Sequence, residues 1–96
     1  MLFVITAMDK PDSLSLRAAV RPDHLEYARE TGRVKLGGPF LDEKGDMIGS
    51  LVVIDAPDLE AARRWQAQDP YARAGLFARS DLHPWKATVN ACGAEF

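Results

Sequence analysis

The 96 residues suffice for one domain but not for two independent hydrophobic cores. A formal net charge of −2 and the lack of any block of Lys and Arg argue against nucleic acid as a partner. The single cysteine, Cys92, excludes an intrachain disulfide, and no apolar run is long enough to span a bilayer. We therefore expect a cytoplasmic protein that binds neither nucleic acid nor membrane.

The first third of the chain predicts a strand followed by two short helices. Residues 2–8 are almost continuously apolar, which is typical of a buried strand. Pro22 interrupts the helical pattern that follows, because a proline inside a helix removes a hydrogen bond but fits well at a first helical position. We therefore predict one helix over about 13–20 and a second from Pro22 to Thr31, ended by Gly32 in the left-handed conformation.

The rest of the chain predicts three strands and one main helix. Their boundaries come from alternating or continuous apolar patterns, from an Asp cap and from Pro and Gly punctuation. The predicted elements are strands over 33–40 and 47–55, a helix from Asp58 to about Gln68, a helical turn over 69–75, and a last strand over 76–89 that bends at Pro84.

The order of these elements predicts an α+β, ferredoxin-like βαββαβ fold. It has a four-stranded antiparallel sheet with helices on one face. The apolar runs 2–8 and 47–54 leave the second face of the sheet in need of cover, so we expect a homodimer in which two sheets pack together. One domain spans residues 1–96, with a core over 1–88 and a C-terminal tail over 89–96.

Two segments that lie 45 positions apart each place a titratable residue beside a proline, at His24 and at Asp69. If they meet, an imidazole and a carboxylate form a pair suited to proton transfer. The first turn of a helix that begins at Pro22 disfavours a positive charge on His24, whereas a nearby Asp69 favours one. The plainer alternatives are a surface histidine and an N-cap, although Asp69 can cap a turn and still hold an imidazole.

Five further positions offer contacts to a ligand, and each also has a structural interpretation. The guanidinium of Arg17 can bind an acidic substrate or pair with a nearby acid, and for Arg21 we favour ion pairing or solvation. Gly38 and Pro39 can shape a pocket or mark a β-bulge. Ser50 can donate a hydrogen bond or lie half exposed on its strand. No spacing of His and acidic residues indicates a metal site, and no nucleotide-binding fingerprint is present.

Several short motifs, in order from Met1 to about Ala87, together carry a family resemblance. They are Ala7-Met8-Asp9-Lys10, Arg17, Arg21-Pro22-Asp23-His24-Leu25, Gly32-Arg33, Gly38-Pro39, Gly49-Ser50, Leu59-Glu60-Ala61-Ala62 and Asp69-Pro70-Tyr71. The chain resembles the YCII-related proteins, small bacterial proteins with a dimeric α+β barrel fold. The resemblance implies that His24 and Asp69 are a catalytic pair and that Gly38, Pro39 and Ser50 line a pocket.

These observations predict a cofactor-independent enzyme that performs an elimination or isomerisation on a small, acidic, aromatic or unsaturated substrate. His24 would move the proton, Asp69 would orient and charge-stabilise it, and Arg17 and Ser50 would contact the substrate. Two alternatives stay open at this point. One is a non-catalytic, small-molecule-binding dimer, and the other is a cofactor-free oxygenase of the same fold.

Overall fold

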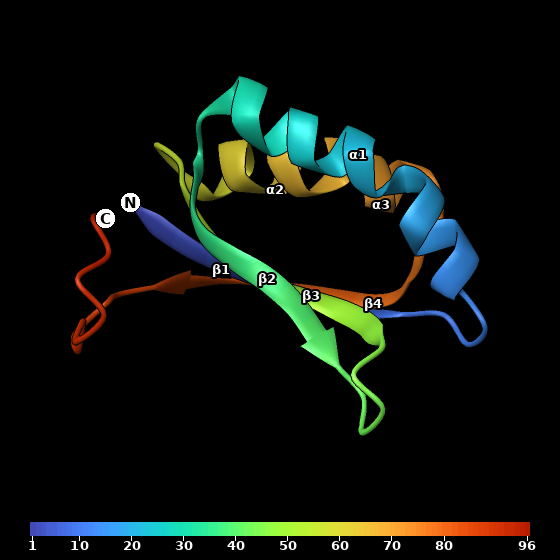
Figure 1. The fold of residues 1–96 in the computed structure, drawn as a ribbon. Coiled ribbons are helices and arrows are strands. Elements are labelled where there is room, and N and C mark those ends of the chain that lie inside the picture. Colours follow the sequence, from blue (N-terminus) through green and yellow to red (C-terminus); the bar gives the residue numbers. More distant parts are fainter.

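A computed structural model, which describes residues 1–96, has a four-stranded sheet with its helices on one face (Figure 1). The elements in chain order are β1 (Leu2–Asp9), α1 (Leu14–Thr31), β2 (Val34–Leu41), β3 (Met47–Asp55), α2 (Leu59–Gln68), α3 (Pro70–Arg73) and β4 (Phe77–Trp85). The strands are ordered β2-β3-β1-β4, and every neighbouring pair is antiparallel. The predicted ferredoxin-like fold is therefore confirmed.

The hydrophobic core lies between the sheet and α2. The central strands β1 and β3 pair Phe3 with Ile54 and Ile5 with Val52, and all four side chains are buried on the helix side. Trp65 of α2 packs against them. By contrast, Arg17 is the only buried residue of α1. Because α1 contributes so little apolar surface, space remains between it and the sheet.

Helix α1 is continuous across Pro22, so the prediction of two separate helices was wrong. Pro22 removes only the hydrogen bond that residue 22 would donate to the carbonyl of Ala18. Both residues are exposed, so water can satisfy that carbonyl at little cost. Local sequence preference therefore yields to the contacts that hold both halves of the helix. The left-handed ending at Gly32 is as predicted, with φ at 64°.

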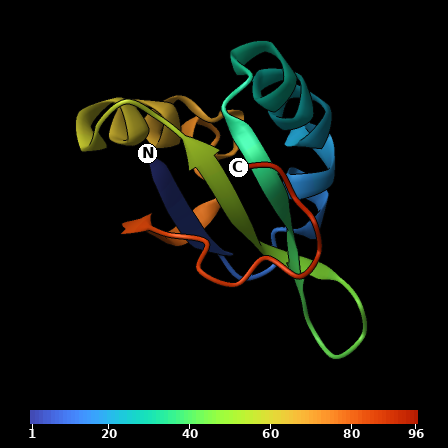
Figure 2. The same ribbon diagram turned by 90° about the vertical axis from the view of Figure 1, so that its left-hand side faces the viewer.

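The last strand, β4, ends at Trp85 and not at residue 89 as predicted. It continues through Pro84, because β4 is an edge strand and a proline there need not donate to a neighbour. The tail beyond it folds back so that the rings of Phe96 and Trp85 meet edge to face, 6.0 Å between centroids. Figure 2 shows this tail at the same end of the molecule as the N-terminus. None of the helices combines the length and apolarity needed to cross a bilayer.

A substitution at Gly49 tests how closely β1 and β3 approach each other beside Ser50. A Cβ at position 49 would lie 2.4 Å from the carbonyl oxygen of Ala7. We expect Gly49→Ala to lower the free energy of unfolding by about 1–3 kcal/mol, because the two strands must move apart. The matched control is Gly38→Ala, where a Cβ meets nothing within 4 Å. Chemical denaturation of both variants measures the difference, and equal losses would contradict the packing described.

Candidate functional site

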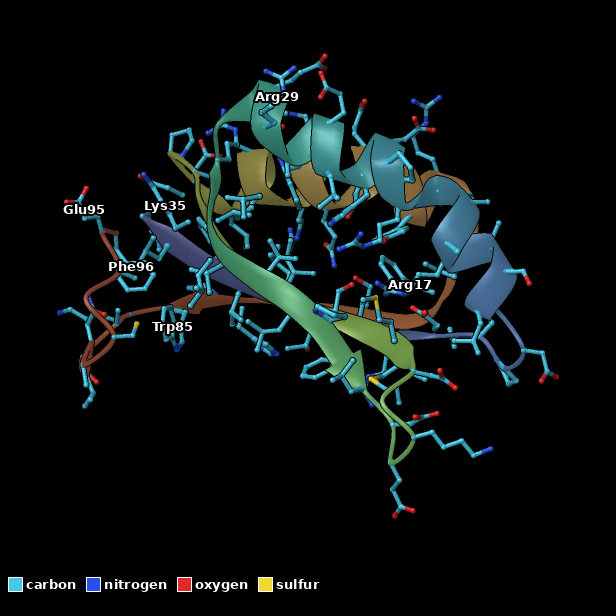
Figure 3. All side chains as sticks on the ribbon, in the orientation of Figure 1. Arg17, Arg29, Lys35, Trp85, Glu95 and Phe96 are labelled. Carbon is cyan, nitrogen blue, oxygen red and sulfur yellow. The ribbon has the colours of Figure 1, made fainter.

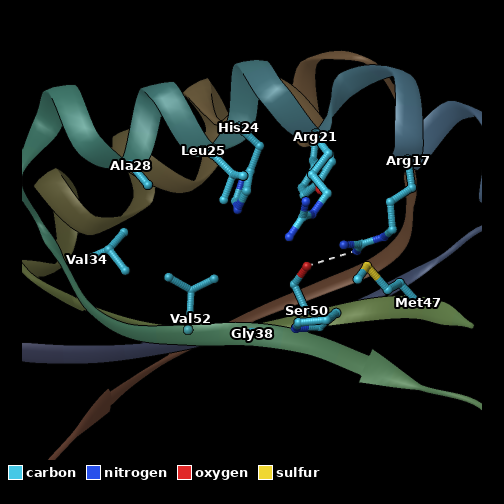
Figure 4. Close-up of a pocket in the computed structure, with 13 residues that line it drawn as sticks. Arg17, Arg21, His24, Leu25, Ala28, Val34, Gly38, Met47, Ser50 and Val52 are labelled. Atoms are coloured by element: carbon cyan, nitrogen blue, oxygen red, sulfur yellow. Dashed lines mark hydrogen bonds between the residues drawn. The ribbon is translucent and has the colours of Figure 1, made fainter. Parts of the chain in front are cut away.

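A cavity of about 210 Å³ lies between α1 and the strands β2 and β3 (Figure 4). A cavity of roughly 150 Å³ accommodates benzene, so this one can hold a single substituted six-membered ring. Its walls are partly apolar, including Leu25, Val34 and Val52. The polar lining residues are Arg17, Arg21, His24, Ser50 and Tyr71.

Helix α1 supplies one wall of the cavity from a single face. Arg17, Arg21, His24 and Ala28 follow the spacing i, i+4, i+7 and i+11, which places them in one row of a continuous helix. Figure 4 shows this row directed toward the sheet, where Ser50 of β3 lies opposite. The continuity of α1 across Pro22 is what aligns the two arginines with the histidine.

His24 and Asp69 meet, as the family resemblance implied. Nδ1 of His24 lies 2.8 Å from Oδ1 of Asp69, and the two side chains are only 13% and 7% exposed. The same oxygen accepts the backbone N–H of Tyr71 at 3.0 Å, which confirms Asp69 as the cap of α3. Capping and imidazole binding therefore coexist on one carboxylate.

The contact with Asp69 determines which nitrogen of His24 is free. A carboxylate accepts hydrogen bonds, so the neutral ring carries its proton on Nδ1 and its lone pair on Nε2. Nε2 makes no hydrogen bond within the protein. Every fully buried side-chain nitrogen or oxygen does have a partner, so Nε2 is not fully buried. Because His24 lines the cavity, Nε2 faces it. His24 lies within α1 and not in a first turn, so the expected dipole effect on its charge was wrong.

Tyr71 packs against both His24 and Arg17. Its ring stacks on that of His24, with 4.2 Å between centroids and 18° between planes. The guanidinium carbon of Arg17 lies 4.5 Å from the centroid of the same ring. Burial raises the pKa of the Tyr71 phenol, while the charges of Arg17 and Arg21 oppose the rise. The phenol is therefore protonated at neutral pH and can donate a hydrogen bond.

Arg17 joins the cavity to the end of β1. Its Nε lies 2.6 Å from Asp9 Oδ2, and its Nη2 donates to Asp9 Oδ1 and to Ser50 Oγ, each at 2.9 Å. Burial lowers the pKa of Arg17, but the hydrogen bonds and charge of Asp9 raise it more. Because Ser50 Oγ accepts from Arg17, its own hydroxyl hydrogen remains available to a ligand.

The structure places every candidate position from the sequence at or beside this cavity. Arg17, His24, Gly38, Pro39 and Ser50 line it, and Asp69 lies behind His24. The irregularities in the pairing of β2 with β3 fall at Val34/Leu36 and Phe40/Leu41, not at the glycines.

Sequence reasoning assigned no role to Asp9 or Tyr71, and for Arg21 it favoured ion pairing or solvation over ligand binding. Arg21 is exposed, as expected, but it makes no ion pair and it lines the cavity. The spacing of Arg21 from Arg17 and His24 was the available signal, and the assumed break at Pro22 concealed it. His83 pairs with Val4 on the other face of the sheet, and no group of three or more His, Cys, Asp or Glu residues is arranged to hold a metal ion.

Residues 1–86 match the YCII-related domain family. Protein YciI of Escherichia coli O6:H1 is 38% identical over 95 residues, which covers 90% of this chain and 97% of that protein. The structure is similar to that of 5-chloro-2-hydroxyhydroquinone dehydrochlorinase (TftG) from Burkholderia phenoliruptrix AC1100 in complex with 2,5-dihydroxybenzoquinone. That match has a TM-score of 0.81 and 33% identity, and it covers 90% of this chain and 94% of the other.

A more distant likeness supports the fold alone. SnoaB, a cofactor-independent oxygenase from Streptomyces nogalater, matches with a TM-score of 0.60 and 16% identity, over 92% of this chain and 95% of that one. Such neighbours are dimeric α+β barrel proteins.

The tautomer of His24 can be tested directly. We expect long-range ¹H–¹⁵N NMR of the neutral ring to show the proton on Nδ1, because Asp69 only accepts. Asp69→Asn should mix the two tautomers, since an amide can donate as well as accept. His83, which is exposed and unpaired, serves as the internal control and should not change. A neutral His24 protonated on Nε2 in the unmodified protein would contradict the geometry.

Proposed function

The chain belongs to the YCII-related family, and we propose that it is an enzyme that transfers a proton in the elimination or isomerisation of a small ring-shaped substrate. One observation carries the proposal. Asp69 holds Nδ1 of His24 at 2.8 Å, and Nε2 faces a cavity of about 210 Å³ that suits a single ring. A fixed base beside a ring-sized space is the arrangement that general acid–base catalysis requires.

In this proposal the lone pair of His24 Nε2 accepts a proton from the bound ring. In an elimination the electron pair of the broken bond to hydrogen forms a new double bond while the leaving group departs with its own electron pair, so the step is redox-neutral. Asp69 stabilises the imidazolium that forms and fixes the ring in the correct tautomer without taking the proton itself. The backbone N–H of Tyr71 holds the carboxylate in place, so the pair is pre-organised.

Arg17 and Ser50 take different parts in binding. Nε and Nη2 of Arg17 are engaged with Asp9 and Ser50, so we propose that Arg17 acts as a positioning residue. It directs the hydroxyl hydrogen of Ser50 toward the substrate. Gly38 and Pro39 form the facing wall of the cavity and determine how closely a ring can approach β2.

The likeness to TftG favours elimination over the other reaction classes. That protein is named as a dehydrochlorinase, which is an elimination, and the ligand in its structure is a single ring. A non-catalytic binding module is the second candidate, because it needs the cavity but not the His24–Asp69 pair. The oxygenase SnoaB shares only 16% identity, so it adds nothing in favour of oxygen chemistry here.

The catalytic role of His24 is tested with 5-chloro-2-hydroxyhydroquinone. We expect the protein to release chloride and His24→Gln to lower turnover by about 10²–10⁴-fold, the usual contribution of a general base. His83→Gln is the matched control, because it removes the other histidine from the far face of the sheet. Chloride release that is unaffected by His24→Gln would contradict the proposal, and ring binding without any turnover would favour the binding module.

We also propose that a second copy of the chain covers the open face of the sheet. No helix lies on that face (Figure 1), and Figure 3 shows Trp85 on the side away from the helices. Leu36 and Trp85 are 46% and 41% exposed in the single chain. Val4 and Leu51 alternate with the core residues of β1 and β3 and so lie on the same open face, as does Val53, which is already buried in the single chain. Such a continuous apolar face needs a partner.

The oligomeric state tests this arrangement. We expect light scattering to give twice the single-chain mass of 10.6 kDa and Leu36→Asp to give the single-chain mass, because it buries a charge between two sheets. Leu14→Asp is the control, since Leu14 is equally apolar and 49% exposed but lies on α1. A monomer at micromolar concentration in the unmodified protein would refute the dimer.

A further inference from the structure

The cavity carries one positive charge that no acid neutralises. None of its thirteen lining residues is Asp or Glu. The guanidinium of Arg17 is paired with Asp9, and His24 is paired with Asp69. Arg21 is in none of the ion pairs of the structure, although it lies between those two residues on the same face of α1. The free charge at this site is therefore that of Arg21.

The guanidinium of Arg21 is placed to act inside the cavity. Figure 4 shows it directed from α1 toward β3, where Ser50 lies. Its charge reaches the buried ring of Tyr71, because it is among the charges that oppose the burial-driven rise in the pKa of that phenol. Arg21 is exposed to solvent as well as lining the cavity. Its side chain therefore lies at the mouth of the cavity, where it can contact a ligand that enters.

We propose that Arg21 and Ser50 together bind an anionic oxygen of the ligand, so that the substrate is a ring bearing a carboxylate or an ionised hydroxyl. This inference names the substrate class of the same site and so rests on the proposed function. A guanidinium presents paired N–H groups that match a carboxylate, and such charge-assisted hydrogen bonds are stronger than neutral ones. The hydroxyl hydrogen of Ser50, whose oxygen is already held by Arg17, supplies a further donor.

Holding the anion at Arg21 also orients the ring for His24. The two residues are three positions apart, which is a rise of about 4.5 Å along a helix. An anionic oxygen at Arg21 therefore holds the bound ring in one orientation beside His24, which lines the same cavity. A neutral ring lacks this anchor and has no reason to adopt one orientation.

Benzoate and benzamide are the probes, because they match in size and shape and differ in charge. By calorimetry or ligand-observed NMR we expect the protein to bind benzoate at least tenfold more tightly, and added NaCl to weaken benzoate alone. Arg21→Gln should abolish the preference and leave benzamide unchanged, while Arg21→Lys keeps part of it. Arg63→Gln is the matched control: Arg63 is exposed on α2, is in no ion pair and lies outside the cavity, so the preference should persist.

The binding test of Arg21 and the chloride-release test of His24 can fail independently. Failure of benzoate to bind more tightly than benzamide, or a preference that survives Arg21→Gln, overturns the inference and leaves the His24 result standing. In the other direction, His24→Gln should lose chloride release and keep the preference for benzoate. A loss of that preference in His24→Gln as large as in Arg21→Gln would assign the charge to the histidine and not to Arg21.

Discussion

One carboxylate oxygen ties three helices together. Oδ1 of Asp69 accepts the backbone N–H of Tyr71 and contacts Nδ1 of His24, and Asp69 stands between the end of α2 and the start of α3. The tautomer of the imidazole follows from this contact, which joins α1 to α3 in addition to the bonds that Arg17 and Tyr27 make to the sheet and to α2. Since the capping bond fixes the carboxylate before any ligand binds, the histidine is oriented by the fold itself.

The charges of the cavity fall into two groups with different tasks. Asp9 neutralises Arg17, and Asp69 binds the imidazole of His24, behind the cavity wall where these side chains are almost fully buried. Leaving the buried charge of Arg17 or Asp9 without its partner costs about 3–5 kcal/mol, so this ion pair is a fixed part of the structure. Arg21 alone is left unpaired at the mouth. Structural charges are thus satisfied within the protein, and the remaining charge is left for a ligand.

The sequence predicted the strands, the fold and the two helix boundaries at Gly32 and Asp58, because apolar periodicity and capping are local signals. The meeting of His24 with Asp69 was predicted mainly from family resemblance, since nothing local indicates a contact over 45 positions. The break at Pro22 was wrong because tertiary contacts outweighed a local preference.

The wall of the cavity opposite α1 is an edge strand. β2 is hydrogen-bonded only to β3, and most of its residues are exposed. Segments with few buried side chains open at lower free energy than the core, so we expect β2 of the single chain to exchange its amide hydrogens sooner than the central strands β1 and β3. His24 and Asp69 belong to other elements. Movement of β2 would therefore leave the geometry of the histidine and its carboxylate unchanged.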